Sequence, residues 1–587
     1  MNRLRLAFSL ALVALSAGPA RAASRPAVEA ERGMVVASER RAAEIGADIL
    51  RRGGNAIDAA VAVGFAEAAT NPCCGNLGGG GFLVAHLAAA HRDVFIDFRE
   101  TAPAAASKTM YLDPAGAPIP GASLDGWRAV ATPGTVLGLD AALSEYGTMD
   151  RATVMAPAIA LARDGFVLSR ADADILQAFA PRFKVDAEAA KIFLRPDGSP
   201  LQPGDRLVQS DLAATLQMIA EHGPDAFYRG AIAEKIGAAM RANGGVLGAA
   251  DLAAYKIGED APLACDYRGY RFVSAPPPSS GGVTLCEILN VLEGYDLKGL
   301  GFHSAATVHL MVEAMRHAFF DRNTQLGDPA FVANPLDRLL SKDYAARIRT
   351  AILPDKATPS AELRPGVAPH EKSETTHYSI IDRDGNAAAV TYTINGPFGA
   401  GVIAPGTGFF LNDEMDDFTI KPGVANLFGL VQGEANVIAP GKRPLSSMAP
   451  TLVEKDGQVV LALGSPGGSR IITTVLETAL NLIDYGMGLQ EAVDAPRFHH
   501  QWLPDAVFAE PYAFSPDTQK LLEGMGYKIV VQAPWSAAEV AATAEAAAGG
   551  SGPAAGNPDS IFGGAMRSGF LYGANDDRRP AGAAIGE

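Results

Sequence analysis

The stretch that decides the fold is residues 375–395, TTHYSIIDRDGNAAAVTYTIN. It contains two strand-like runs around Asp384-Gly385, which is a strong hairpin signal. The segment before it, residues 352–374, holds four prolines and several charges without periodicity, which indicates a mobile connector. The abrupt change from connector to sheet at Thr375 is the most informative boundary in the chain.

A second strand with a tight turn lies further along, at residues 459–470, VVLALGSPGGSR. The residues after the turn, RIITTVLETALNLIDYG, have the apolar spacing of a helix. Gly467 and Gly468 therefore come just before a helix N-terminus, where unpaired backbone donors and the helix dipole favour negative charge.

The residues before the connector predict a largely helical half. Residues 38–69 have helical apolar spacing on both sides of Gly53-Gly54, which predicts two helices, the second one buried. Two short strands are expected near residues 80–100. Further amphipathic helices are expected between about residues 130 and 350, broken by PPPSSGG at 276–282: they lie at 153–164, 211–221, 229–242 and 306–321.

Four consecutive glycines, Gly78 to Gly81, precede the first of these strands. The run lacks the Lys-Ser/Thr of a phosphate-binding loop, and no dinucleotide-binding spacing follows it. We therefore expect the glycines to allow tight backbone packing.

Length and composition exclude several classes of protein. At 587 residues the chain exceeds the roughly 250–300 residues of a single core, so two domains or two interlocked halves are expected. The net charge is −16 without a Lys/Arg run, which argues against a nucleic-acid partner. Residues 537–556 have low complexity and are expected to be a surface insertion.

The chain begins like an exported protein. Residues 1–22 combine a basic start, an apolar run from Leu6 to Ala17 and the small-x-small signal Ala20-Arg21-Ala22, which predicts a removed signal peptide. An uncleaved membrane anchor is the alternative, but the apolar run is short for a bilayer span of about 20 residues. A periplasmic or secreted protein is expected, with no membrane span once mature.

The four cysteines are too few for a disulfide framework. A bond between the adjacent Cys73 and Cys74 would be strained. A bridge between Cys265 and Cys286 is possible, but two small buried residues are the preferred interpretation. None of the four has metal-ligand spacing with histidine, so no metal site is predicted.

Longer motifs resemble a known family. The segment ETTHYSIIDRDGNAAAVTYTIN is followed in order by FGAG, LNDEMDDF, GKRPLSSMAPT, GSPGGSRIITTV and APRFHHQWLPD. This order is similar to the small subunit of γ-glutamyltranspeptidases, and IDFRE, DLAAYK and PPPSSGG in the other half support the resemblance.

The resemblance implies an α+β fold, the four-layer αββα sandwich of N-terminal nucleophile hydrolases, with strands from both halves. It also implies self-cleavage at Glu374–Thr375. The products would be a mostly helical large subunit, residues 23–374, and a small catalytic subunit, residues 375–587, which form a heterodimer.

A threonine hydroxyl is a poor nucleophile near neutral pH unless a base lies beside it. If Thr375 becomes a chain terminus, its own α-amine, with an ordinary pKa of about 7.7–8.0, can accept the proton. By composition alone Thr375-Thr376 would merely start a strand. The resemblance assigns Thr375 as the nucleophile and Thr393 as the hydroxyl that supports processing and orients it.

Hairpin register offers a check on this pair. A two-residue loop at Asp384-Gly385 would place Thr375 opposite Ile394, whereas an odd-length loop over 382–386 would place it opposite Thr393. We predict the odd-length loop.

The resemblance also assigns the substrate pocket. Gly467 and Gly468 resemble an oxyanion hole, in which backbone amides face the tetrahedral oxygen. A γ-glutamyl donor carries a free α-carboxylate and a free α-ammonium, so both charges need partners. The implied carboxylate partners are Arg99, Ser446 and Ser447, and the implied ammonium partners are Asn395, Glu414 and Asp417.

Asp417 bears on the choice of substrate. Related cephalosporin (glutaryl) acylases handle a group without an ammonium, so an aspartate here favours γ-glutamyl chemistry, although the adjacent Asp416 could confuse the assignment. Residues 422–435 correspond to a lid in the family. In several relatives a tyrosine at the position of Phe428 bonds the residue matching Asn395; phenylalanine cannot, so looser gating is expected.

His377 and the pair His499-His500 are expected to be structural, with His377 pointing away from Thr375. The implied function is cleavage of glutathione and related γ-glutamyl compounds through a γ-glutamyl-threonine ester, with transfer to water or to amino acid or dipeptide acceptors. No cofactor or metal is implied. The alternatives are a cephalosporin (glutaryl) acylase of the same fold and, from another class, an exported non-enzymatic binding protein.

Overall fold

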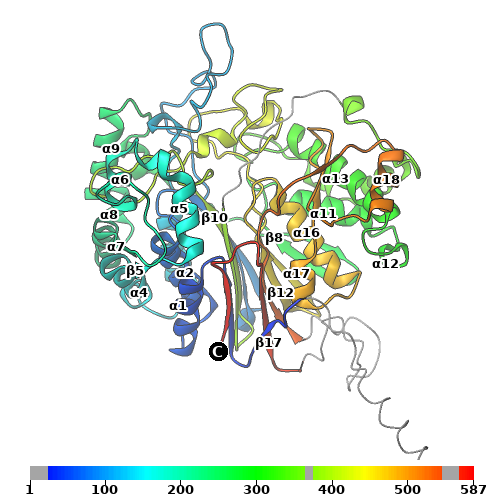
Figure 1. Ribbon diagram of the computed structural model, residues 1–587, viewed down its shortest axis with the longest axis horizontal. Coiled ribbons are helices and arrows are strands. Elements are labelled where there is room, and N and C mark those ends of the chain that lie inside the picture. The colour runs from blue at the N-terminus through cyan, green and yellow to red at the C-terminus, as the bar shows by residue number, and fades with distance from the viewer. Residues whose placement is uncertain (1–23, 364–374, 545–566) are drawn as a thin grey trace, which may run out of the picture.

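The computed structural model describes residues 24–363, 375–544 and 567–587. Two β-sheets face each other at the centre of the molecule (Figure 1). In sheet order, the six-stranded sheet consists of β18 (Ala583–Gly586), β2 (Gly33–Ala37), β9 (Thr376–Asp382), β10 (Ala387–Thr393), β3 (Gly80–Leu87) and β4 (Arg92–Asp97). The seven-stranded sheet consists of β1 (Val28–Ala30), β17 (Leu571–Asn575), β16 (Glu539–Thr543), β12 (Gln458–Gly464), β11 (Thr451–Lys455), β8 (Tyr270–Ser274) and β7 (Leu263–Tyr267).

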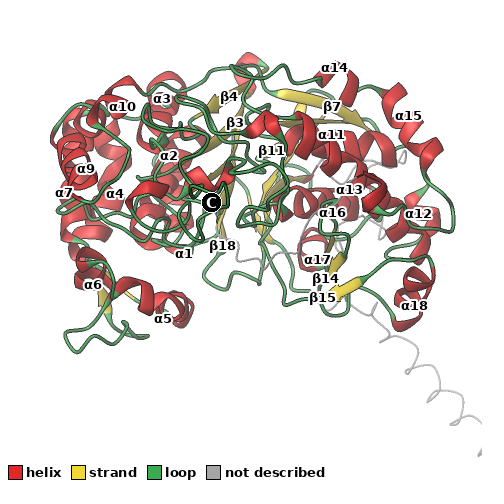
Figure 2. Ribbon diagram, turned by 90° about the horizontal axis from the view of Figure 1, so that it is seen from above, coloured by secondary structure: helices red, strands yellow, loops and turns green. Residues whose placement is uncertain are grey.

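Helices cover the outer face of each sheet, as Figures 1 and 2 show from two directions. Against the six-stranded sheet lie α1 (Arg40–Arg51), α2 (Ala56–Thr70) and α3 (Thr135–Tyr146), while α4 (Arg151–Asp164) packs on α2 and α7 (Ser210–His222) packs on α4. Against the seven-stranded sheet lie α11 (Gly281–Leu292), α16 (Arg470–Ile483) and α17 (Leu489–Asp494), while α13 (Ala305–Gln325) packs on α11. The predicted four-layer αββα sandwich is confirmed.

Smaller elements complete the two flanks. On the side of the six-stranded sheet these are β5 (Phe166–Val167), α5 (Arg170–Phe183), α6 (Ala187–Phe193), β6 (Arg206–Leu207), α8 (Asp225–Tyr228), α9 (Ala231–Ala242) and α10 (Ala249–Ala254). On the other side they are α12 (Leu297–Leu300), α14 (Leu336–Leu339), α15 (Lys342–Ala351), β13 (Phe498–His499), β14 (Val507–Ala509), α18 (Pro516–Gly524) and β15 (Ile529–Val531). The predicted helices are all present.

The hairpin of β9 and β10 has the predicted odd register. Ile381 pairs with Ala387 and Thr376 pairs with Tyr392, which brings Thr375 opposite Thr393. The turn closes where the Asp382 amide donates to the carbonyl of Asn386. Strands β2 and β3, from the other half of the chain, flank this hairpin, so both halves build the sheet.

Two predictions about the chain are wrong. Cys265 and Cys286 form a disulfide, and so do Cys73 and Cys74. Residues 539–543 are not a surface insertion but β16, which lies between β12 and β17 with Val540, Ala541 and Ala542 fully buried. Small alanine side chains suit this position because β16 also packs against β9 of the facing sheet.

Several other predictions fall outside the described residues. These are the signal peptide at 1–22, residues 364–374 of the connector at 352–374 and the remainder of the low-complexity segment. Among the helices that the structure describes, none is both long and apolar enough to cross a membrane.

Candidate active site

A small pocket lies at the end of the β9–β10 hairpin, with about 270 Å³ of space not filled by atoms. Segments that are far apart in the sequence line this pocket. Its lining contains every residue that the sequence assigned to the site except Gly467: Arg99, Thr375, Thr393, Asn395, Glu414, Asp417, Ser446, Ser447 and Gly468, together with Phe428, Met448 and Ile471.

The two threonine hydroxyls meet in this pocket. Thr375 Oγ1 lies 3.3 Å from Thr393 Oγ1, and the amide of Asn395 donates to Thr393 Oγ1 at 2.8 Å. The glycine run packs directly behind them, since a Cβ on Gly79 would lie 1.9 Å from the Thr393 carbonyl oxygen. The prediction that these glycines allow tight packing is confirmed.

Gly467 and Gly468 form the turn between β12 and α16. Their φ angles are 135° and 56°, a region that favours glycine. A Cβ would lie 2.0 Å from Ser536 Oγ at Gly467 and 2.3 Å from the Phe428 ring at Gly468. Within the described residues neither amide donates a hydrogen bond, so both remain available to an oxyanion at the N-terminus of α16.

Arg99 is a fully buried cation surrounded by carboxylates. Its guanidinium bonds Glu414 and Asp417, lies 3.4 Å from Glu100, and donates through Nε to the Pro444 carbonyl. Burial acts to lower the pKa of Arg99, but the carboxylates outweigh it and raise that pKa. The hydroxyl of Tyr255, from the DLAAYK motif, fixes the Arg99 carbonyl at 2.9 Å.

Two buried acceptors in the pocket lack a protein donor. Among the described residues, Asn395 Oδ1 and Glu414 Oε2 have no hydrogen-bond partner. Burial raises the pKa of Glu414 well above its usual range, against the opposing effect of Arg99. A second cation beside Glu414 would favour its ionised form, and a buried acceptor without a donor costs stability, so this part of the pocket suits an ammonium group.

The two serines keep their hydroxyl hydrogens available. Ser446 Oγ accepts from the Met448 amide at 3.1 Å, and Ser447 Oγ accepts from Arg322 Nη2 at 2.8 Å. Within the described residues neither hydroxyl donates, so both can donate to an anion in the pocket. Ser280, from PPPSSGG, holds the segment because its amide donates to the Ser446 carbonyl at 2.8 Å.

Comparison with known proteins identifies the family. The family model described as Gamma-glutamyltranspeptidase matches residues 42–584. The chain belongs to this family. The chain is 55% identical to the glutathione hydrolase proenzyme of Pseudomonas sp. (strain A14), over 99% of both chains. It is 50% identical to the glutathione hydrolase proenzyme of Escherichia coli (strain K12), over 94% of this chain and 91% of that one.

A solved structure of related fold is the cephalosporin acylase from Bacillus halodurans. It has a TM-score of 0.81 and 26% sequence identity, and the match covers 97% of this chain and 98% of that one. Because the gamma-glutamyltranspeptidase family is a family of enzymes, membership disfavours the alternative of a non-enzymatic binding protein.

Arg322 was missed by the sequence analysis. It lies near the C-terminal end of α13, fully buried behind Ser447, and its Nε has no partner among the described residues. Burial lowers the pKa of Arg322 to about 10. The charge of Asp417 acts to raise this pKa, and the charge of Arg99 acts to lower it further. Nothing in the sequence singled Arg322 out, because α13 carries several buried polar side chains, a second arginine, Arg316, among them.

The prediction for His377 is wrong in direction. Residues two apart on a strand share a face, so His377 lies on the same face as Thr375. Its Nδ1 lies 2.7 Å from Thr391 Oγ1 and its Nε2 lies 3.0 Å from Ser379 Oγ. Burial lowers its pKa to about 3, so it is neutral near pH 7.

The pair His499-His500 lies outside the pocket lining. Nδ1 of His499 contacts Thr473 Oγ1 at 2.9 Å, and Nε2 of His500 lies 3.4 Å from Asp505. Burial lowers the pKa of His499 well below its ordinary value and that of His500 to about 4. Their structural assignment stays a prediction.

Two neighbouring aspartates hold the segment that carries Phe428. Asp417 Oδ1 accepts from Asn426 at 3.3 Å, while Asp416 accepts from the Leu427 amide at 2.7 Å and from Ser123 at 2.7 Å. Asp416 therefore lies behind the lid segment, and Asp417 is the one that lines the pocket.

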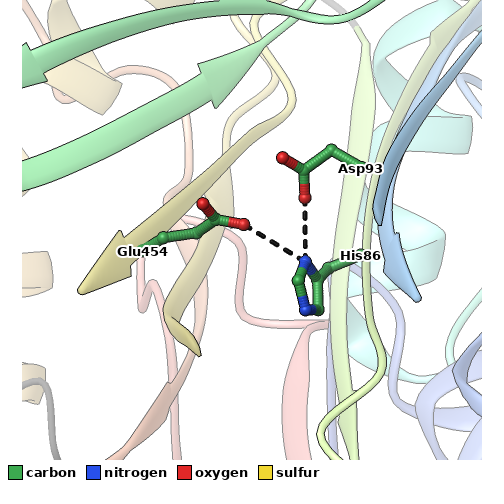
Figure 3. Close-up of side chains that lie close together, drawn as sticks. All are labelled: His86, Asp93 and Glu454. Carbon is green, nitrogen blue, oxygen red and sulfur yellow. Dashed lines mark hydrogen bonds and ion pairs between the residues drawn. The ribbon is translucent and has the colours of Figure 1, made fainter. Parts of the chain in front are cut away.

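A separate ion-pair network joins the two sheets away from the pocket (Figure 3). His86 Nδ1 on β3 lies 2.8 Å from Asp93 on β4 and 3.1 Å from Glu454 on β11. Arg271 on β8 bonds the second oxygen of both carboxylates at 2.6 Å. Since the arginine already partners both carboxylates, the group is an ion-pair clasp between the sheets.

This clasp predicts a pH-dependent stability. The bonds to Asp93 and Glu454 raise the pKa of His86 to about 9, above its unfolded value of about 6.5. The stabilisation is therefore complete below pH 6.5 and lost as the pH rises through 9. We expect His86→Gln to cost about 1–2 kcal/mol at pH 6, after allowing for solvent screening, and almost nothing at pH 10.

Thermal unfolding at the two pH values measures this difference. His91→Asn, which changes an exposed histidine in the β3–β4 turn, is the matched control and should differ little at either pH. An equal loss for His86→Gln at pH 6 and pH 10 would show that the ion pairs are not the cause.

Proposed function

We propose that this chain is a self-processing enzyme that hydrolyses glutathione and transfers γ-glutamyl groups. It cuts itself between Glu374 and Thr375, and the resulting chains, residues 23–374 and 375–587, remain together as a heterodimer. The observation that carries the proposal is a pocket in which Thr375 lies beside a fixed cation and two acceptors that have no donor within the described part of the chain. Export by the segment 1–22 to the periplasm or the medium belongs to the same proposal.

The chemistry follows from the groups in the pocket. The freed α-amine of Thr375 takes the hydroxyl proton, and Oγ1 attacks the γ-carbonyl carbon. The amides of Gly467 and Gly468 stabilise the oxyanion, the donor amine leaves with a proton, and a γ-glutamyl ester remains on Thr375. Water then gives glutamate, whereas the amine of an amino acid or dipeptide acceptor gives a new γ-glutamyl amide.

Charge balance supports a γ-glutamyl donor. In the pocket Arg99 pairs with Glu414 and Asp417. A γ-glutamyl group adds one carboxylate, which Arg99, Ser446 and Ser447 would bind. It also adds one ammonium, which Asn395 and the two acidic residues would bind. The net charge of the site is therefore unchanged on binding, which limits the cost of burying charge.

A glutaryl group is the second candidate, because the matched fold includes a cephalosporin acylase. A glutaryl group would add a negative charge to a pocket that already holds two carboxylates, without an ammonium for the free acceptors. This disfavours glutaryl amides by leaving buried polar groups unpaired.

Asp417→Ala tests the two candidates directly. We expect kcat/KM for a γ-glutamyl anilide to fall by about 100-fold or more, because a partner of the ammonium is lost, while the low rate with a glutaryl anilide does not fall. Release of the chromogenic amine measures both. Asp456→Asn, an exposed aspartate in the β11–β12 turn, serves as control. A wild type that prefers the glutaryl anilide would overturn the γ-glutamyl assignment.

A further inference from the structure

Within residues 24–363, 375–544 and 567–587, the strand end that carries Thr375 is paired on one side only. Strand β2 pairs with β9 from Asp382 to Tyr378 and then leaves the sheet through Ser38 towards α1. Among the residues that the structure describes, Thr376 consequently has a ladder partner only in β10. On the open side the Ser38 hydroxyl reaches the His377 carbonyl at 3.4 Å.

A side-chain bond on the opposite face replaces the missing ladder. Thr376 Oγ1 donates to Glu67 Oε2 at 2.6 Å, and Asn71 Nδ2 lies 3.5 Å from the same hydroxyl. Glu67 belongs to α2, whose fifteen residues are all buried and mostly apolar. Thr376 follows Thr375 directly, so the contact lies one residue from the nucleophile.

Glu67 is costly to keep in this position. Its side chain is 0% exposed, and its Oε1 has no partner among the described residues. Burial raises the pKa of Glu67 to about 8, and the nearby charge of Glu39 adds to this rise. The hydrogen bonds from Thr376 and Asn71 and the charge of Arg579 act to lower the pKa. Near pH 7 it is largely a neutral acid, and a buried polar group with an unmet hydrogen bond costs about 1–3 kcal/mol.

Cleavage makes an anchor at Thr376 necessary. Once the bond before Thr375 is cut, the chain holds Thr375 only through Thr376, and free termini are poorly ordered unless they are tied down. Small errors in the position of a reacting group cost large factors in rate.

We propose that Glu67 is a positioning residue, whose hydrogen bond to Thr376 holds the new N-terminus so that the Thr375 hydroxyl faces Thr393 and the glycine amides. This inference rests on the proposed function, in which Thr375 is the nucleophile. Glu67 touches neither substrate nor reacting atoms and acts only through Thr376.

The test distinguishes an effect of the Glu67–Thr376 hydrogen bond on kcat from effects of the Glu67 charge and of impaired folding. Glu67→Leu is expected to lower kcat by about 10- to 100-fold per mole of cleaved enzyme, with KM changed less than about 2-fold. Glu67→Gln should recover most of the loss, because its amide oxygen still accepts from Thr376. Thr376→Val should lose as much as Glu67→Leu, and the double variant should lose no more than either.

Asp58→Asn is the matched control, since it removes another buried carboxylate of α2 that bonds Thr148 and not the hairpin. It should lower the thermal midpoint and leave kcat unchanged. Any of three results would overturn the inference: a wild-type kcat in Glu67→Leu, equal losses of kcat in Glu67→Gln and Glu67→Leu, or additive losses of kcat in the double variant. Thr375→Ala is measured alongside: if it turns over substrate, the proposed function itself fails.

Discussion

Thr375→Ala is expected to remain one uncleaved chain and to lose turnover by at least about 10⁴-fold, the scale seen when a nucleophile is removed. Two effects combine in this variant. The hydroxyl that attacks both the scissile peptide and the substrate is gone, and without cleavage no α-amine forms to act as base. Thr393, 3.3 Å away, cannot replace it, because Thr393 stays in mid-chain at the end of β10 and has no free α-amine.

Intact mass and release of a chromogenic amine measure the two effects together. Thr375→Ser keeps a hydroxyl and should still cleave, with reduced turnover. Thr350→Ala changes an exposed threonine of α15 and should match the wild type. Turnover by Thr375→Ala near the wild-type rate would remove Thr375 from the mechanism.

Arg99→Gln has the second largest expected effect. The change removes the only partner that the structure gives to Glu414 Oε1 and leaves carboxylates buried without their cation. Breaking a buried ion pair costs about 3–5 kcal/mol, and a loss of this size in binding the transition state corresponds to roughly a 10²- to 5 × 10³-fold fall in kcat/KM for γ-glutamyl amides.

A donor without the α-carboxylate distinguishes binding from general damage. With a 4-aminobutyryl anilide the wild type and Arg99→Gln should differ by less than about 10-fold, because the group that Arg99 binds is absent from this donor. Arg443→Gln, which loses a buried ion pair with Asp97 outside the pocket, is the control. An equal fall with both donors would show that Arg99 supports the fold and not the carboxylate.

Much of the fold and of the pocket could be predicted from sequence, for physical reasons. The register of β9 and β10 follows from period-2 geometry once the loop is odd, but the hairpin signal alone allowed a two-residue loop as well, and the resemblance that pairs Thr375 with Thr393 decided between them. The convergence of Arg99, Asn395 and Ser446 was not predictable from local patterns, because three distant segments meet only in the folded sandwich. That part depended on the resemblance to a family.

The errors also have physical causes. His377 was placed on the wrong face, although residues two apart on a strand share a face. The prediction of a surface insertion is wrong for β16 because alanine-rich composition does not distinguish a loop from a sheet strand that packs closely against a facing sheet. Arg322 and Glu67 carry no local signal, since their importance comes from partners more than a hundred residues away.

The most direct test of the central claim is the mass of the small chain when turnover of a γ-glutamyl donor is stopped with acid. The account predicts a fraction of this chain that is heavier by one γ-glutamyl group, attached to the peptide that begins at Thr375. Turnover by an uncleaved chain, or a γ-glutamyl group attached to any other residue, would contradict it.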